Sequence, residues 1–304
     1  MLSVLFLGTS AARPTVERNV TGLMITREGE SLLVDPGEGT QRQMMRYGAS
    51  FAFREVFVSH FHADHYLGLI GLVRTLGLQG RTEPLVCYGP RGARRVIGAA
   101  LALGFERSPF EVEIVELESG QELSRDGYVL SAFAVEHGAG ALGLVLREAE
   151  RPGRFDPDAA RAAGVPEGPL WGELQRGRAV TLPDGRRVGP EAIVGAPRPG
   201  RKLVYAGDTR PCAATIQAAV NADLLIHEAT FGAEEADRAR DTQHATAAEA
   251  AQVAKMASVR QLVLTHVSAR YSRDSTALLE EARAVFPETA VAKDGYVVEI
   301  RHRD

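Results

Sequence analysis

Residues 56–66 read Val-Phe-Val-Ser-His-Phe-His-Ala-Asp-His-Tyr, so four side chains able to bind metal directly follow a short apolar run. The apolar residues 56–58 are typical of a buried strand. The four side chains after it are His60, His62, Asp64 and His65. Neutral imidazole and carboxylate groups are common ligands of Zn²⁺ and similar divalent ions. The pattern therefore predicts a metal site at the end of this strand.

The spacing of these residues would let one loop offer ligands to two ions. His60 and His62 project together if the backbone stays extended, because side chains two apart share a face. Asp64 and His65 would then turn away at the start of a helix, toward a second position. The alternative is a polar loop with scattered histidines, but three histidines and an aspartate after a buried strand argue against it.

The same arrangement recurs further along the chain, where other predicted strands end in a histidine or an aspartate. These later residues are His137, Asp208, His227 and His266. An α/β scaffold gathers residues from distant sequence at converging strand ends, so we expect a shared site. We interpret His227 as structural rather than as a ligand. Asp35 also follows a strand; it could be an N-cap or a functional carboxylate, and we favour a structural role.

The chain is β-rich at its start, and strands and helices then alternate, which predicts an α/β (α+β) fold. Strands are predicted over residues 2–8, 23–25, 32–34, 56–58, 85–88, 112–117, 128–135, 142–146, 203–206, 224–226, 262–264 and 297–300. Helices are predicted over residues 41–47, 66–78, 91–103, 156–164, 215–220, 246–256 and 278–285.

Composition limits the class of protein. The chain has 304 residues, 45% of them hydrophobic, and a net charge of −4, which argues against a protein that is basic all over. The apolar N-terminus is too short to span a membrane and lacks the basic start of a signal peptide. Cys87 and Cys212 form no Cys-x-x-Cys pair and are predicted to be packing residues in a reducing compartment. We expect a cytoplasmic protein with no membrane association.

Residues 147–202 differ in character from the rest of the chain. They hold 9 Gly and 8 Pro in 56 positions, and 11 Arg or Lys against 8 Asp or Glu. Such composition disfavours long regular elements, and connections this long are usually functional or disordered. The segment could be a solvated surface loop. Its composition and charge fit an arm inserted at residues 148–200 into a single domain that spans residues 1–304.

The motif His60-x-His62-x-Asp64-His65, followed by His137, Asp208 and His266, resembles the metallo-β-lactamase superfamily. Almost the whole chain fits. Within that superfamily the chain is most similar to the ribonuclease Z family of tRNA 3′-processing endonucleases. The segments that carry this resemblance are residues 7–10, 18–19, 37–43, 227–231, 266–271 and 292–295, together with Gly164-Val165-Pro166-Glu167-Gly168-Pro169-Leu170 in the arm.

The resemblance implies a four-layer αβ/βα sandwich with a site for two divalent metal ions, Zn²⁺ or else Mn²⁺ or Fe²⁺. One ion would be held by His60, His62 and His137, and the other by Asp64, His65 and His266. Asp208 would bridge them. Asp64 would also act as the base that orients or deprotonates water. His244, oriented by Glu228, would protonate the leaving 3′ oxygen.

The resemblance also implies the partners. Precursor tRNA would be the substrate, Ser268 and Arg270 would contact its phosphate, and the arm would grip the tRNA elbow. The arm residues concerned are Arg151, Arg154, Gly168 and Pro169. A homodimer is expected, with the arm of one subunit serving the other. The alternative function is a metal-dependent hydrolase of small phosphodiesters or related esters on the same fold.

Two positions depart from the pattern of the family. Val16 stands where the loop after Pro14 usually carries a lysine, which leaves open how the chain treats precursors that end in CCA. The family's His-Ser-Thr loop appears as His244-Ala245-Thr246, in which the histidine is kept.

Overall fold

A computed structural model describes residues 1–104, 107–138 and 140–303. Two seven-stranded sheets account for most of the strands in these ranges. The first sheet runs in the order β16 (Val297–Glu299), β1 (Leu2–Gly8), β2 (Gly22–Arg27), β3 (Glu30–Val34), β4 (Glu55–Phe57), β5 (Leu85–Pro90) and β6 (Val112–Leu117). The second runs in the order β15 (Thr289–Val291), β14 (Leu262–Thr265), β13 (Leu224–Glu228), β12 (Lys202–Tyr205), β9 (Leu142–Glu148), β8 (Tyr128–Ala134) and β7 (Glu122–Arg125).

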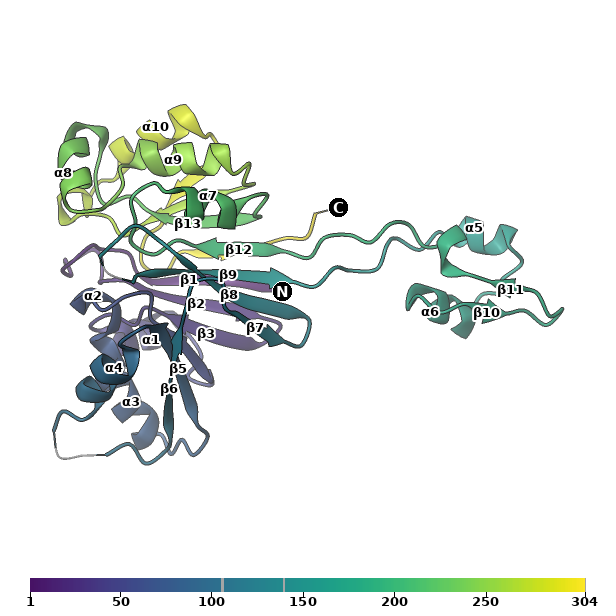
Figure 1. Cartoon of the computed structure of the whole chain (residues 1–304), viewed down its shortest axis with the longest axis horizontal. Helices are drawn as coiled ribbons and strands as arrows, with labels where there is room; N and C mark the ends of the chain where they lie inside the picture. Colours follow the sequence, from purple (N-terminus) through teal and green to yellow (C-terminus); the bar gives the residue numbers. More distant parts are fainter. Residues whose placement is uncertain (105–106, 139, 304) are drawn as a thin grey trace. The chain divides into compact units, whose positions relative to one another are not determined.

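Helices cover one face of each sheet (Figure 1). The first sheet carries α1 (Thr40–Tyr47), α3 (Gly68–Leu78) and α4 (Ala93–Leu101), and the second carries α7 (Ala213–Ala219), α9 (Ala247–Met256) and α10 (Thr276–Val285). Met44, Leu72 and Ile97 fill the first helix–sheet interface, and Val253 and Leu278 fill the second. Burial of such faces is the main force that stabilises the layers. The predicted helix–sheet–sheet–helix sandwich is confirmed.

Strand direction explains why the site forms at one edge. β12, β13 and β14 are parallel neighbours, and in the other sheet β3, β4 and β5 are parallel neighbours. The carboxyl ends of parallel strands lie at the same edge of a sheet, and ligands of open α/β sheets bind outside those ends. The loops after β4, β12 and β14 therefore carry most of the residues that the sequence predicted to meet, and His137 follows β8.

The predicted helix over residues 66–78 is wrong at its start. The chain forms two helices, α2 (Ala63–Tyr66) and α3, joined at Leu67. Gly68 lies so close to the next loop that an added Cβ would be 1.8 Å from the Gly37 carbonyl oxygen. Only glycine allows this approach, which fixes the start of α3 against the loop that follows Asp35.

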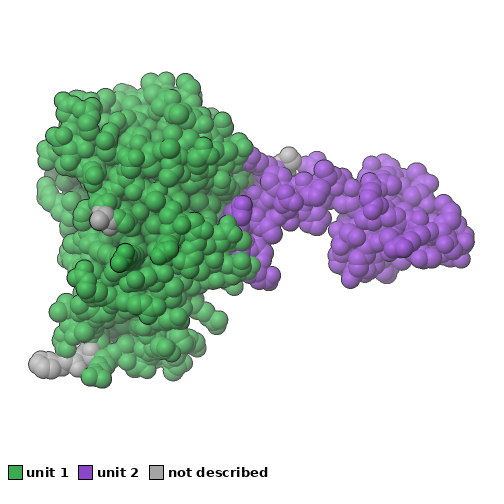
Figure 2. Space-filling view, viewed as in Figure 1, with its two compact units in different colours: residues 1–125, 129–146, 202–301 green, residues 126–128, 147–201, 302–304 purple. Residues whose placement is uncertain are grey.

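A second compact unit consists of residues 126–128, 147–201 and 302–304 (Figure 2). It contains α5 (Pro157–Ala162), α6 (Pro169–Gln175), β10 (Val180–Thr181) and β11 (Arg187–Val188). The Asp156 side chain caps α5 by accepting from the backbone N–H of Asp158 and Ala159. A small core stabilises the unit; it consists of Ala160, Val165, Leu174, Val180, Leu182 and Ile193.

The segment that enters this unit pairs with the segment that leaves it. Arg151 and Arg198 exchange backbone hydrogen bonds of 2.8 and 2.9 Å. Further along, an added Cβ at Gly153 would be 1.8 Å from the Gly195 carbonyl oxygen. At the other end, Arg201 binds both carboxylate oxygens of Glu148 at 2.7 Å, and each side chain is 5% exposed. Such two-point pairing fixes the orientation of both side chains. We call the two paired segments, residues 148–156 and 193–201, the stem.

Among the described residues, no helix is both long enough and apolar enough to cross a membrane.

Candidate metal centre and catalytic cleft

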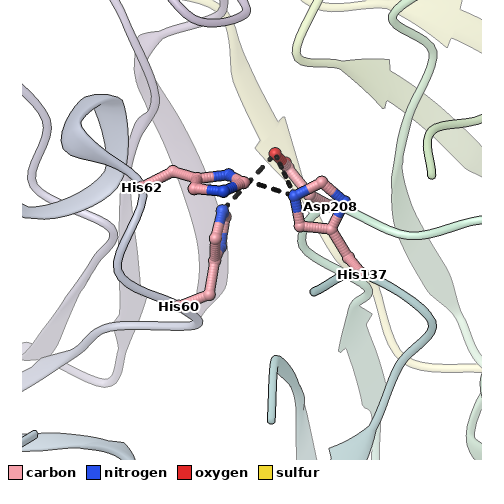
Figure 3. Close-up of side chains that lie close together, drawn as sticks. All are labelled: His60, His62, His137 and Asp208. Atoms are coloured by element: carbon pink, nitrogen blue, oxygen red, sulfur yellow. Dashed lines mark hydrogen bonds and ion pairs between the residues drawn. The ribbon is translucent and has the colours of Figure 1, made fainter. Parts of the chain in front are cut away.

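The first cluster of possible ligands joins His60, His62, His137 and Asp208 (Figure 3). One ligand atom from each lies within 4.8 Å of the others. The His137 Nε2 atom is 3.1 Å from His62 Nδ1, and His60 Nε2 is 3.7 Å from Asp208 Oδ2. Three imidazoles and a carboxylate at this spacing are a donor set that suits a divalent ion.

The second cluster joins Asp64, His65 and His266, with ligand atoms again within 4.8 Å of one another. Asp208 Oδ2 lies 3.3 Å from His65 Nε2 and 3.2 Å from His266 Nε2, so its carboxylate stands between the two clusters. Burial raises the pKa of Asp64, but the hydrogen bond from His266 and the charge on His65 outweigh it and lower this pKa below its usual value. Asp64 is therefore a carboxylate at neutral pH.

Local backbone geometry divides the His60–His65 loop between the clusters. His62 is extended, with φ −69° and ψ 144°, and is the N-cap of α2. Asp64 and His65 lie within the single turn of α2, so their side chains leave in a different direction from that of His62. This is the division that the spacing predicted.

Unsatisfied buried atoms test whether the clusters fit metal ions. His60 Nε2, His65 Nε2 and Asp208 Oδ1 are buried without a hydrogen-bond partner among the described residues. Buried polar atoms are rarely left unpaired in folded proteins. Because these three atoms belong to the two clusters and can all act as acceptors, a bound cation would satisfy them. The residues therefore fit one or more divalent ions.

Asp35 supports His65 from behind. One carboxylate oxygen of Asp35 is 2.9 Å from His65 Nδ1 and accepts from the Tyr205 hydroxyl at 2.6 Å, and Ser59 donates through its hydroxyl and its backbone N–H. Asp35, His65 and Tyr205 are each no more than 2% exposed. Such a partner fixes the orientation and tautomer of a ligating histidine. The structural role that we favoured for Asp35 thus serves the site itself.

We expect Asp35→Asn to weaken metal binding by roughly 10- to 100-fold, because loss of an outer partner of a ligand has effects of that size. The amide can accept fewer of the four hydrogen bonds, so His65 loses its fixed orientation. Competition with a chelator of known affinity measures the change. Asp223→Asn is the matched control, since Asp223 is also a buried aspartate and binds the Lys202 backbone N–H away from both clusters. Equal metal affinity in Asp35→Asn and the wild type would contradict this role.

A second buried carboxylate, Glu228, holds His244. Its Oε1 atom is 2.7 Å from His244 Nδ1 and accepts from the Thr209 backbone N–H at 2.9 Å. Burial lowers the pKa of His244, but the charge of Glu228 and its hydrogen bond outweigh burial and raise this pKa to about 9. The pair therefore keeps a proton on Nδ1 and leaves the other ring nitrogen for a reacting group.

Thr230 was not predicted, although it lies in the 227–231 segment that carried the resemblance. Its hydroxyl donates to Glu228 Oε2 at 2.7 Å and lies 2.9 Å from His266 Nδ1. It therefore connects the carboxylate behind His244 with a residue of the second cluster. Composition alone gives no signal for this, because a threonine after a strand is usually a surface or capping residue.

The clusters open into a pocket of about 530 Å³. Of the predicted residues, it is lined by His62, Asp64, Asp208, His244, His266, Ser268 and Arg270. The pocket is also lined by Arg13, Phe231 and Arg238, which the sequence did not predict as site residues. His227 is fully buried and belongs to neither cluster, in line with its structural interpretation.

Four predicted substrate contacts lie in the second unit. Gly168 and Pro169 begin α6. Arg151 and Arg154 line a separate pocket of about 580 Å³ together with Arg198. Their role with substrate stays a prediction.

Comparison with known proteins agrees with the fold. Residues 2–140 match the family model described as Anti-Pycsar protein Apyc1, and residues 191–267 match the one described as Beta-lactamase superfamily domain. The crystal structure of human tRNase Z, short form, superposes with a TM-score of 0.70 at 26% identity over 98% of this chain and 99% of its own. A metallo-β-lactamase fold protein from Bacillus subtilis also gives a TM-score of 0.70, at 20% identity over 98% of each chain.

Two curated relatives extend over nearly the whole chain. A ribonuclease Z from Gemmatimonas aurantiaca is 55% identical over 98% of this chain and 96% of its own. One from Myxococcus xanthus is 54% identical over 100% of this chain and 99% of its own. The fold and its clustered histidines and aspartates define a hydrolase of the metallo-β-lactamase superfamily. The chain belongs to the ribonuclease Z family.

Proposed function

We propose that the chain is a metal-dependent endoribonuclease that removes the 3′ trailer from precursor tRNA and leaves a 3′-hydroxyl on the tRNA. The observation that carries this proposal is the whole-length match to two bacterial ribonucleases Z, together with both ligand clusters. The similarity to a human tRNase Z supports tRNA as the substrate.

One experiment tests the proposal against its rival. The purified protein is given a 3′-extended precursor tRNA and a panel of small phosphodiesters, and its metal content is measured. We expect a single cut at the 3′ end of the tRNA and bound divalent metal. Hydrolysis of the small esters without cleavage of the precursor would favour the alternative function, a small-phosphodiester hydrolase on the same fold.

The site residues take the following roles in this proposal. His60, His62 and His137 would hold one divalent ion, and Asp64, His65 and His266 would hold another. The Asp208 carboxylate, which stands between the two clusters, would be available to both ions. Ions bound here would neutralise charge on the phosphate and lower the pKa of a water. Zn²⁺ fits the imidazole and carboxylate donors, as do Mn²⁺ and Fe²⁺.

Asp64 orients the attacking water or accepts its proton. Its Oδ2 atom is held by the Ala12 backbone N–H at 2.8 Å, and it lies at the edge of the pocket where substrate would enter. The lowered pKa of Asp64 keeps it a carboxylate at neutral pH, able to orient a water by accepting its hydrogen bond.

His244 supplies the proton to the leaving 3′ oxygen. Glu228 fixes its ring through Nδ1, and the ring lines the pocket beside Asp208 and His266. General acids need both this fixed geometry and a proton at working pH. Ser268 and Arg270, which line the same pocket, would contact the phosphate of the substrate.

We expect His244→Asn to lower the rate of precursor cleavage by roughly 10²–10⁴-fold, the usual contribution of a positioned acid. The metal content should stay that of the wild type, because the change leaves both ligand clusters intact. The rate of hydrolysis of bis(p-nitrophenyl) phosphate should fall much less, because p-nitrophenolate leaves without needing a proton. Single-turnover rates on both substrates measure the difference. Loss of metal, or equal loss on both substrates, would contradict the assignment as proton donor.

The second unit supplies the tRNA-binding arm in this proposal. Residues 148–200 grip the elbow of the tRNA, with Gly168 and Pro169 at the start of α6 and Arg151 and Arg154 as phosphate contacts. The excess of basic over acidic residues in this segment supports contact with a polyanion. The resemblance further supports a homodimer in which the arm of one subunit serves the cleft of the other. The buried, unpaired Cys87 and Cys212 fit a cytoplasmic location.

A further inference from the structure

Two arginines, Arg13 and Arg238, line the pocket without a hydrogen-bond or ion-pair partner for their side chains among the described residues. Both are exposed. Arg270, on the same pocket, is already paired with Glu235 at 3.4 Å. A guanidinium group presents five N–H donors whose geometry matches a phosphate. Unpaired arginines beside a phosphodiesterase centre are therefore free to bind phosphate groups of the substrate.

Arg238 belongs to the wall that carries His244. Its Cζ atom lies 5.7 Å over the centre of the Phe231 ring, and this ring meets the His244 ring edge-on at 6.1 Å between centroids. Phe231 is 5% exposed, so it is a fixed platform. A cation on an aromatic face is held in place while its N–H groups stay free to donate. Arg238 therefore presents its donors to the pocket that the proposed proton donor also lines.

Arg13 belongs to the wall that carries Asp64. The N–H of Arg13 donates to the Ala11 carbonyl at 2.6 Å, and Ala12, between them, has φ +60° and donates its own N–H to Asp64 at 2.8 Å. The Ser10 hydroxyl also holds the Arg13 carbonyl, at 2.8 Å. A left-handed alanine is strained and persists only where its surroundings impose it, often at functional sites. The turn fixes Arg13 next to the carboxylate that orients the attacking water.

The direction of the reaction then assigns each arginine to one side of the cut; this step rests on the proposed function. In an in-line displacement, the attacking water and the leaving oxygen lie on opposite sides of phosphorus. The leaving oxygen is the 3′ oxygen of the tRNA, and His244 protonates it. The tRNA therefore extends from the His244 side, and the trailer, which keeps the phosphorus through its 5′ oxygen, leads away from that side.

We propose that Arg238 binds the phosphate one nucleotide upstream of the scissile bond, on the tRNA, and that Arg13 binds the first phosphate downstream, on the trailer. The two arginines would set the position of the cut by holding the backbone on both sides of it. The ligand class at each is an RNA phosphodiester.

Neutral linkages test this assignment one phosphate at a time. Precursors are made with a single methylphosphonate either at the upstream or at the downstream linkage, and kcat/KM is compared with that of the unmodified precursor. In the wild type we expect each neutral linkage to lower kcat/KM by about tenfold, a usual loss for a charge-assisted contact. Arg238→Ala and Arg13→Ala should each show a loss of the same size on the unmodified precursor.

The decisive result is the pattern of coupling. In Arg238→Ala the upstream neutral linkage should lower kcat/KM hardly any further, while the downstream neutral linkage should lower it as much as in the wild type. Arg13→Ala should show the reverse, and its defect should also shrink on a trailer of one nucleotide, which has no phosphate beyond the scissile one. Arg95→Ala, an exposed arginine on α4, is the matched control and should couple to neither linkage.

Other outcomes would overturn the proposal. One is that a neutral linkage has the same effect in Arg13→Ala or Arg238→Ala as in the wild type. Another is that the two arginines couple to the opposite linkages. A third is that the loss of kcat/KM in Arg238→Ala disappears when the last base of the tRNA is removed, and not when the upstream linkage is made neutral. Failure of the proposed function would be seen separately, because the wild type would then not cleave the unmodified precursor.

Discussion

Replacing His65 by alanine is expected to lower cleavage of a 3′-extended precursor tRNA by roughly three orders of magnitude or more, since ions in such a site activate the water and neutralise the phosphate. His65 Nε2 lies 3.3 Å from Asp208 and 3.6 Å from Asp64, at the junction of the two clusters. Its side chain is fully buried, so the solvent cannot replace it as a ligand. Cleavage rate and metal content, measured on the same preparation, check the result.

Two further variants separate loss of the ligand from loss of the fold. His65→Asn keeps an amide group that can bind Asp35 but has no atom at the position of Nε2, so it should also be inactive while unfolding at a urea concentration close to that of the wild type. His302→Ala removes a histidine from the second unit, outside both clusters, and should retain hydrolysis of small phosphodiesters. A folded His65→Asn protein that cleaves precursor tRNA at nearly the wild-type rate would remove His65 from the site.

The sequence could predict the clustered residues because each follows a recognisable strand. His60, Asp208 and His266 come after apolar runs that form strands with parallel neighbours, and such strands bring their last residues to a common edge whatever the loops between them do. His137 also comes after an apolar run, in β8. Helix–sheet layering was equally predictable from the alternation of elements. Short edge strands such as β7 and β15 were missed, because pairing with a neighbour rather than their own pattern defines them.

The supporting residues could not be predicted in the same way. Asp35 acts through His65, and Thr230 acts through Glu228 and His266, so their roles depend on contacts between residues far apart in the chain. Arg238 lies in a short helix, α8 (Ala236–Asp241), whose composition reads as a solvated surface. Its significance comes from Phe231 beneath it and from the pocket in front of it, and neither is visible in a pattern of residue types.

Removing the tip of the second unit is expected to lower kcat/KM for precursor tRNA by roughly 100-fold or more, while hydrolysis of bis(p-nitrophenyl) phosphate stays near the wild-type rate. Linked binding sites raise affinity by about that factor or beyond it, and the second site is lost with the tip. The stem indicates where to cut. Residues 154–194 are replaced by Asn-Gly, a pair that closes a two-stranded hairpin, so that Gly153 and Gly195, which already lie against each other, become its last residues.

The design keeps the backbone pairing of Arg151 with Arg198 and the buried Glu148–Arg201 ion pair, so the two segments of the stem stay paired. Salt gives a second measurement, because each lost phosphate contact should make the slope of log affinity against log salt concentration shallower by roughly 0.7 to 0.9, the values for single strands and for B-form DNA. A shallower slope with loss of tRNA cleavage alone is the signature of a separate RNA-binding site. Equal losses on both substrates would mean instead that the second unit is needed for the catalytic cleft itself, and an unchanged slope would exclude the electrostatic part of the argument.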